Sequence, residues 1–248
     1  MLFRSTYPAE VTAMSSAGEV GDEPLMIFRR TECPVMVDPD RVRAAQALVA
    51  DYDCDVIVSD DGLQHYALER QLEIVVVDGR RGFGNGLCFP AGPLREPVSR
   101  LEEVDLVVVN GEATHVKELE NSRFTEMKLQ PTRLLNMTNA ACENLEYLRG
   151  RAVHAVAGIA DPQRFFNTLR LLGYEVVPHE FPDHHEYALS DIQFDDMLPI
   201  ITTEKDAVKL KSLALGCDHD QYWYLEVAAE LPAGVYNQIL QKTGLTTG

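Results

Sequence analysis

The sequence is poor in positive charge. It has 22 lysine and arginine residues against 39 aspartate and glutamate residues, which gives a formal charge of −17 over 248 residues. A surface of this sign repels nucleic acid and anionic lipid headgroups except where basic residues cluster locally. We therefore expect no nucleic-acid partner, whereas a divalent cation is compatible with such a surface.

Paired cysteines and long apolar runs are also missing. The five cysteines are scattered and none forms a CxxC pair, which favours unpaired thiols in a reducing compartment over a metal site at Cys217, His219 and Asp220. No run approaches the roughly 20 apolar residues that span a membrane. The N-terminal apolar stretch is too short for a signal peptide. We expect a cytoplasmic chain with no membrane anchor of its own.

Apolar runs alternate with segments of helical periodicity through most of the chain. The runs 55–59, 72–78 and 104–110 are uniformly apolar and rich in valine, which predicts a parallel sheet buried on both faces and covered by helices. Further strands are predicted at 34–37, 152–160, 174–181, 199–203 and 222–227. Helices are predicted from about 25, at 38–52 with Asp38 as N-cap, at 161–173, near 191–198, at 204–214 and near 235–244.

The alternation weakens into polar, mixed sequence between about 110 and 150. This break predicts two α/β units: a core at 1–130, a linker region at 131–150 and a smaller α/β C-terminal domain at 151–248. Ligands of open α/β sheets bind beyond the carboxyl ends of the strands. The loops that follow the predicted strands are therefore where functional residues are expected.

The loop after the first valine-rich run contains adjacent aspartates, Asp60 and Asp61, followed by Gly62, Gln64 and His65. Magnesium prefers hard oxygen ligands and needs only one or two carboxylates beside substrate phosphates. A strand ending in aspartate places such a carboxylate in nucleotide-binding enzymes. The simpler alternative is that the aspartates only turn the chain.

The expected partner of such a site, a GxxxxGK[ST] loop that binds phosphate, is absent, since the sequence contains no Gly-Lys dipeptide. The glycine-rich stretch 82–86 lacks both the lysine and a following helix, so it is predicted to be a turn. The sequence thus contains the candidate metal-binding aspartates of a nucleotide site but not its phosphate-binding loop.

Two further motifs combine carboxylates with histidine. In GDEP, 21–24, Asp22 and Glu23 begin a predicted helix, where acidic residues are favourable without any further function. In FPDHHEY, 181–187, Asp183 with His184 or His185 could bind a metal, relay a proton or form a hydrogen-bonded loop. Adjacent histidines on an extended segment point to opposite sides, and one histidine beside a carboxylate is typical of an acid–base pair.

Basic residues occur beside turns in PAGPLREP, 90–97, with Arg95 and Glu96, and in TTEKDAVK, 202–209, with Lys205. In a protein this acidic they favour an anionic ligand, although ordinary surface salt bridges explain them equally well.

These motifs occur in one order along the chain: GDEP, SDDGLQHY, EIVVVDGRRGFGNG, PAGPLREP, VDLVVVNG, AGIADPQRFF, FPDHH and TTEKDAVK. Together they resemble the tetraacyldisaccharide 4'-kinase (lipid A 4'-kinase) family of Gram-negative bacteria. The resemblance implies a P-loop-kinase-like, mostly parallel sheet flanked by helices. It also implies an enzyme that uses ATP and Mg²⁺ to phosphorylate the 4'-hydroxyl of tetraacyldisaccharide 1-phosphate, a lipid A precursor, at the cytoplasmic surface of the inner membrane.

The resemblance also implies roles for individual residues. Asp22 matches the catalytic base and works with His184. The other matched residues are Asp60, Asp61 and Glu23 at the metal, and Gln64, His65, Arg95 and Glu96 at the nucleotide or substrate.

The sequence departs from the family in one respect. Family members carry a hydrophobic membrane-contacting helix and a GGTGKTP-type loop ahead of GDEP, and neither is found here. We therefore expect a truncated chain that is inactive alone, because a phosphate-binding loop supplies several kcal/mol of transition-state stabilisation. The alternatives are a non-catalytic remnant that binds glycolipid or a partner, and a metal-dependent hydrolase using Asp60, Asp61 and His184.

Overall fold

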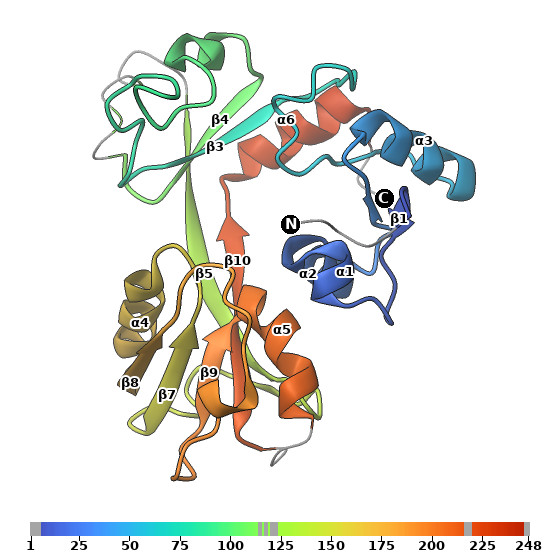
Figure 1. Ribbon diagram of the computed structural model, residues 1–248. Coiled ribbons are helices and arrows are strands. Elements are labelled where there is room, and N and C mark those ends of the chain that lie inside the picture. Colours follow the sequence, from blue (N-terminus) through green and yellow to red (C-terminus); the bar gives the residue numbers. More distant parts are fainter. Residues whose placement is uncertain (1–5, 114–115, 117–118, 120–123, 216–219, 246–248) are drawn as a thin grey trace. The chain divides into compact units, whose positions relative to one another are not determined.

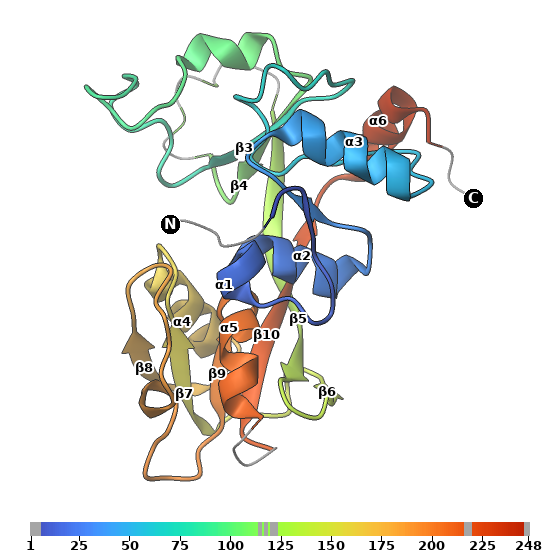
Figure 2. The same cartoon turned by 45° about the vertical axis from the view of Figure 1, so that its right-hand side comes forward.

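The computed structural model describes residues 6–113, 116, 119, 124–215 and 220–245, so Cys217 and His219 lie outside the described residues. The chain divides into two compact units (Figures 1 and 2). Unit 1 consists of Met1–Tyr52 and Pro131–Val227, and unit 2 of Asp53–Gln130 and Ala228–Gly248. Each unit is therefore built from two separate segments, and the linear division at 130 and 150 stays a prediction.

Unit 1 contains a mostly parallel sheet with the strand order β5-β10-β9-β7-β8, and β6 pairs with β5. Parallel pairing joins β10 to β9, β9 to β7 and β7 to β8. The bounds are β5 Thr125–Asn136, β6 Cys142–Glu143, β7 Ala152–Ala157, β8 Glu175–Glu180, β9 Ile200–Thr203 and β10 Tyr222–Glu230. The predicted strands of this region are confirmed, whereas β5 and β6 were not predicted.

Helices cover both faces of this sheet. On β7, Val153 and Ala155 belong to the hydrophobic cluster that contains α4 (Pro162–Leu171). Val156, one residue further, points to the opposite face and belongs to the cluster that contains α5 (Glu204–Ala214). Because side chains alternate along a strand, the largely apolar sequence of β7 serves both layers.

The N-terminal segment adds α1 (Ala17–Val20), α2 (Asp22–Thr31), α3 (Arg41–Asp51) and the antiparallel pair β1 (Ala9–Glu10) and β2 (Met36–Val37) to unit 1. Helix α2 packs against α5. The N-cap of α3 is Asp40, whose side chain accepts the amides of Val42 and Arg43. The prediction of Asp38 as N-cap was wrong, because Asp38 is buried and binds the Arg43 guanidinium at 2.6 Å.

Unit 2 contains the parallel strands β3 (Ile74–Asp78) and β4 (Leu106–Asn110), with the first residues of β5 beside β4. The valine-rich strand β4 is buried on both faces, as expected, whereas β3 exposes Ile74 and Val76 on one face. The unit also contains the 3₁₀ helix η1 (Val98–Glu102) and α6 (Ala233–Thr243).

Two predicted elements are wrong. The run 55–59 forms no strand, and Val58 is 88% exposed. Among the described residues no strand pairs with it, and an unpaired strand leaves its backbone hydrogen-bonding groups to water. The helix expected near 191–198 is replaced by the short 3₁₀ helix η3 (Leu189–Asp191). Asp191 and Asp196 accept the nearby amides of Ala188 and Leu198, and such local bonds compete with a helix.

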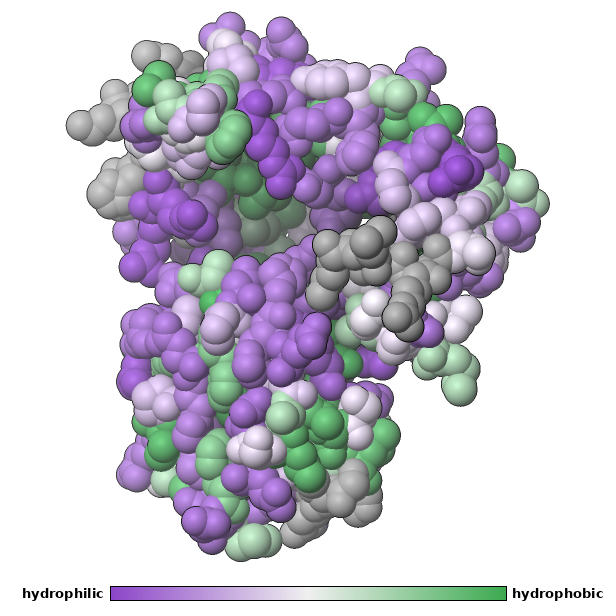
Figure 3. Space-filling model, viewed as in Figure 1, coloured by the Kyte–Doolittle hydropathy of each residue, from purple (hydrophilic) through white to green (hydrophobic). Residues whose placement is uncertain are grey.

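Hydrophilic residues predominate on the face shown in Figure 3, in keeping with the acidic composition. Within the described part of the chain, no helix has the length and apolarity needed to cross a membrane.

Candidate active site

Three loops of unit 1 follow the carboxyl ends of neighbouring parallel strands. Strand β7 leads into Gly158 and β8 into the segment 181–187, and β9 ends at Thr203, which caps α5. This is the edge of an α/β sheet at which ligands bind. The first turn of α2 contributes Asp22 to the same place.

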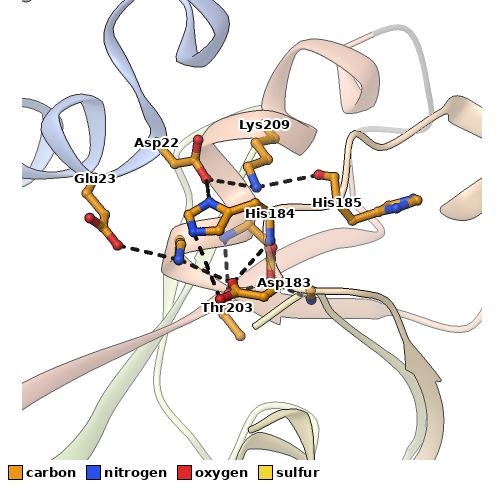
Figure 4. A network of polar contacts seen from close by, with 10 residues as sticks. Asp22, Glu23, Asp183, His184, His185, Thr203 and Lys209 are labelled. Atoms are coloured by element: carbon orange, nitrogen blue, oxygen red, sulfur yellow. Dashed lines mark hydrogen bonds and ion pairs between the residues drawn. The ribbon is translucent and has the colours of Figure 1, made fainter. Parts of the chain in front are cut away.

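Asp22 makes two contacts through one oxygen atom (Figure 4). Nδ1 of His184 lies 3.2 Å from Oδ2 of Asp22, and Nζ of Lys209 lies 2.8 Å from the same Oδ2. The side chains of Asp22 and Lys209 are only 15% and 12% exposed, whereas His184 is 59% exposed. The structure therefore brings together the predicted pair of Asp22 and His184 and adds a lysine to it.

The charged neighbours change the acidity of Asp22. Burial by itself raises the pKa of this carboxyl group. The hydrogen bonds and positive charges of Lys209 and His184 outweigh burial and hold the pKa of Asp22 below its ordinary value. Asp22 therefore stays ionised to a lower pH than an ordinary aspartate.

A second lysine lies beside this pair. Nζ of Lys205 is 3.4 Å from a carboxylate oxygen of Glu23 and 3.4 Å from one of Asp183. Burial lowers the pKa of Lys205, but the charges of Asp183 and Glu23 raise it above its ordinary value overall. The site thus contains three carboxylates, two ammonium groups and an imidazole.

The two adjacent histidines have different partners. His184 has a positive φ of 60°, a conformation that non-glycine residues adopt rarely and that is often found at functional sites. His185 instead stacks on Phe181 at 4.7 Å, and its Nε2 lies 3.1 Å from Asp191. His185 therefore stabilises the loop, and His184 faces Asp22.

The loops of this site are joined by Asp206, a buried residue in the first turn of α5. Its Oδ2 accepts the amide of Gly158 at 3.0 Å and the hydroxyl of Thr203 at 2.7 Å. These bonds connect the loop after β7 to the junction of β9 and α5, the helix that carries Lys205 and Lys209.

A second polar cluster lies in unit 2. Nη1 of Arg95 is 2.9 and 2.8 Å from the two carboxylate oxygens of Asp61 and 3.3 Å from Oε1 of Gln64. Nε2 of Gln64 donates to Oε1 of Glu96 at 2.9 Å. Four of the predicted site residues are therefore joined by contacts, namely Asp61, Gln64, Arg95 and Glu96. His65 belongs to the same loop and its backbone carbonyl accepts from Arg70 at 3.4 Å.

The fit of a magnesium ion depends on Asp60 and Asp61. Both are exposed, and together they supply the one or two carboxylates that Mg²⁺ needs beside water and phosphate. Among the described residues no group of three or more histidine, cysteine, aspartate or glutamate side chains could hold a metal. Glu23 belongs to unit 1 and contacts Lys205 there, so its place in the metal site stays a prediction.

The glycine-rich stretch 82–86 is a turn, as predicted, and it precedes the loop that carries Arg95. Gly84 has a φ of 62°, and a Cβ atom there would lie 2.8 Å from Pro93, so a larger residue would not fit.

Two residues of the unit 1 site were missed from the sequence, Lys209 and Asp206. Lys209 lies four residues after Lys205 on α5, a spacing that places both on one helix face. That spacing could have identified it within TTEKDAVK. The role of Asp206 could not be predicted from the sequence, because it depends on which loops meet in the folded unit.

The chain is similar to one family over nearly its whole length. The model of the family described as tetraacyldisaccharide-1-P 4'-kinase matches residues 4–244. The tetraacyldisaccharide 4'-kinase of Hahella chejuensis is 50% identical over 94% of this chain and 67% of its own length. That of Pseudomonas aeruginosa is 48% identical over 90% of this chain and 65% of its own. The chain therefore spans about two thirds of the length of these curated relatives.

A solved structure has the same fold. The crystal structure of LpxK from Aquifex aeolicus in complex with ATP matches 97% of this chain and 76% of its own, with a TM-score of 0.78 and 24% identity. This likeness confirms the expected α/β class, a mostly parallel sheet flanked by helices.

Proposed function

Because the chain belongs to the tetraacyldisaccharide-1-phosphate 4'-kinase family, we propose that it transfers the γ-phosphate of ATP to the 4'-hydroxyl of a tetraacyldisaccharide 1-phosphate. The observation that supports this most directly is the 3.2 Å contact between Asp22 and His184. A carboxylate held by an imidazole is an acid–base pair suited to a sugar hydroxyl.

The reaction requires little covalent help from the protein. The oxygen of the 4'-hydroxyl bonds to the γ-phosphorus, the bond from that phosphorus to the bridging oxygen breaks, and ADP leaves. Asp22 orients the hydroxyl group and accepts its proton, and His184 holds Asp22 in place. Most of the rate comes from positioning and from stabilising charge in the transition state.

The cluster in unit 2 is assigned to the phosphate end of the reaction. Asp60 and Asp61 would hold Mg²⁺, which neutralises charge on the β- and γ-phosphates when it is bound. Arg95 supplies a guanidinium group suited to phosphate oxygens, and Gln64 with Glu96 fixes the loop around it. His65 completes the set of residues assigned to the nucleotide or substrate.

The partners and the location follow from this proposal. ATP is the donor and the glycolipid is the acceptor, so the enzyme would work at the inner-membrane surface, where an acylated substrate resides. The sequence also raises the opposite possibility, a truncated chain that is inactive alone, and the experiment below decides between the two outcomes.

The test is transfer of ³²P from [γ-³²P]ATP to tetraacyldisaccharide 1-phosphate in detergent micelles, with Mg²⁺ and the 248-residue chain. We expect labelled lipid from the wild-type chain and none from the Asp22→Ala variant. Absence of labelled lipid with the wild-type chain would contradict the proposal. If glycolipid still bound to the chain, that result would favour the alternative of a non-catalytic binding remnant.

A further inference from the structure

Lys209 is a half-buried cation with a defined position on α5. Its ammonium group lies 2.8 Å from Oδ2 of Asp22 and 3.4 Å from the backbone oxygen of His185. Its side chain is only 12% exposed. It is therefore held both by the carboxylate and by the loop that carries the two histidines.

Both donors to Asp22 use the same atom. His184 and Lys209 contact Oδ2, and among the described residues no donor is found on Oδ1 (Figure 4). Two donors on one oxygen fix the rotation of the carboxylate group, which leaves the second oxygen free to face a ligand.

We propose that Lys209 is a positioning residue, which holds Oδ2 of Asp22 so that Oδ1 accepts the proton of the acceptor hydroxyl. This inference rests on the proposed function. Its structural part, the fixed ion pair, is separable from the reaction and is tested separately.

The surroundings explain why a lysine is needed in addition to the histidine. His184 is 59% exposed and lies on a loop, so its contact with Asp22 is open to solvent. Lys209 is only 12% exposed and extends from a packed helix, so it fixes the same carboxylate oxygen from a better defined position.

Lys205 does not share this role. Its ammonium group contacts Glu23 and Asp183 at 3.4 Å, and no contact between Lys205 and Asp22 is found among the described residues. Lys211 lies on the same helix and is exposed, which makes it a matched control for the loss of a lysine from α5.

The first test is side-chain ¹⁵N NMR of the lysine ammonium groups in the whole chain. An ammonium group in a half-buried ion pair exchanges its protons slowly, so we expect an observable Lys209 signal. We expect this signal to shift or disappear in Asp22→Asn and to persist in Asp51→Asn, an exposed control in unit 1. A Lys209 signal that is the same in Asp22→Asn and in the wild type would overturn the proposal.

The second test is steady-state kinetics of Lys209→Met, Lys209→Arg and Lys211→Met. We expect Lys209→Met to lower kcat on the order of 100-fold with KM values for both substrates changed less than about twofold, since the loss is of orientation. Lys209→Arg keeps the charge and should recover most of kcat, and Lys211→Met should match the wild type.

Wild-type kcat in a folded Lys209→Met variant would overturn the proposal, and so would a loss confined to KM. If Lys209→Met does not fold, as judged by thermal unfolding, a low kcat in a folded Lys209→Arg variant that retains the Asp22 contact decides against it. If the wild-type chain transfers no phosphate, the proposed function fails, and the NMR experiment still decides whether Lys209 fixes Asp22.

Discussion

The ion pair of Asp22 and Lys209 in unit 1 is half-buried, whereas the ion pair of Asp61 and Arg95 in unit 2 is open to solvent. In unit 1 the side chains of Asp22 and Lys209 are 15% and 12% exposed. In unit 2 those of Asp61 and Arg95 are 66% and 67% exposed. Each cluster contains an ion pair of 2.8 Å, so the difference lies in the surroundings and not in the contact itself.

This difference indicates different tasks. A half-buried ion pair is weakly screened, which fixes its geometry and changes the acidity of its members. An exposed pair is screened by water and separates at little cost, so its members are available to an incoming metal ion or phosphate. We infer that unit 1 carries the proton acceptor and that unit 2 carries groups that bind and orient.

The largest expected effect is on proton acceptance in unit 1. Asp22→Asn keeps the size of the side chain but removes the base, so we expect kcat to fall about 1,000-fold, within the range of general base catalysis. The measurement is the initial rate of phosphate transfer, with ATP affinity measured in parallel. Asp51→Asn, an exposed control in the same unit, should retain the wild-type rate. A rate near wild type in Asp22→Asn would remove Asp22 from the reaction.

Much of this arrangement was predictable from the sequence. Strands β7 and β9 and helices α2, α4 and α5 have apolar periodicity that is strong enough to locate them, and the loops after the strands carry the polar residues. The pairing of Asp22 with His184, 162 positions apart, was predicted from family resemblance, and the structure places the two side chains 3.2 Å apart.

Other features were not predictable, for physical reasons. The run 55–59 has the composition of a strand but no partner strand among the described residues, and pairing is a property of the fold. Strand β5 was missed because most of its positions are partly or fully exposed and it contains Pro131. Lys209 and Asp206 act through loops that are distant in sequence and meet only in the folded unit.

The second prediction concerns the rigidity of the unit 1 cluster. Asp206→Ala leaves the buried amide of Gly158 without a partner and removes the hydroxyl contact of Thr203. We expect the free energy of unfolding to fall by about 3 kcal/mol, because a buried acceptor with two donors is lost. Urea unfolding measures this change. The exposed Asp195→Ala is the control, and equal stability of the two variants would show that the loops are not joined through Asp206.

The third prediction concerns the metal in unit 2. Asp61→Asn removes a hard anionic ligand, so the Mg²⁺ concentration for half-maximal transfer should rise at least about tenfold. Glu69→Gln, an exposed control in unit 2, should leave it unchanged. An unchanged Mg²⁺ requirement in Asp61→Asn would exclude this carboxylate as a ligand.

The smallest expected effect is on the stability of unit 2. The pair of Arg95 and Asp61 is exposed, so Arg95→Gln should change the free energy of unfolding by less than about 1 kcal/mol. Urea unfolding of this variant beside Asp206→Ala compares the two clusters directly. A larger loss of stability in Arg95→Gln than in Asp206→Ala would invert the contrast between the two units.

The most direct test of the division of tasks is isothermal calorimetry of ATP binding to the 248-residue chain in the presence of Mg²⁺. The account predicts Mg²⁺-dependent binding that is weakened in Asp61→Asn and retained in Asp22→Asn. Undetectable binding by the wild-type chain, or binding that is lost in Asp22→Asn and unaffected in Asp61→Asn, would contradict it.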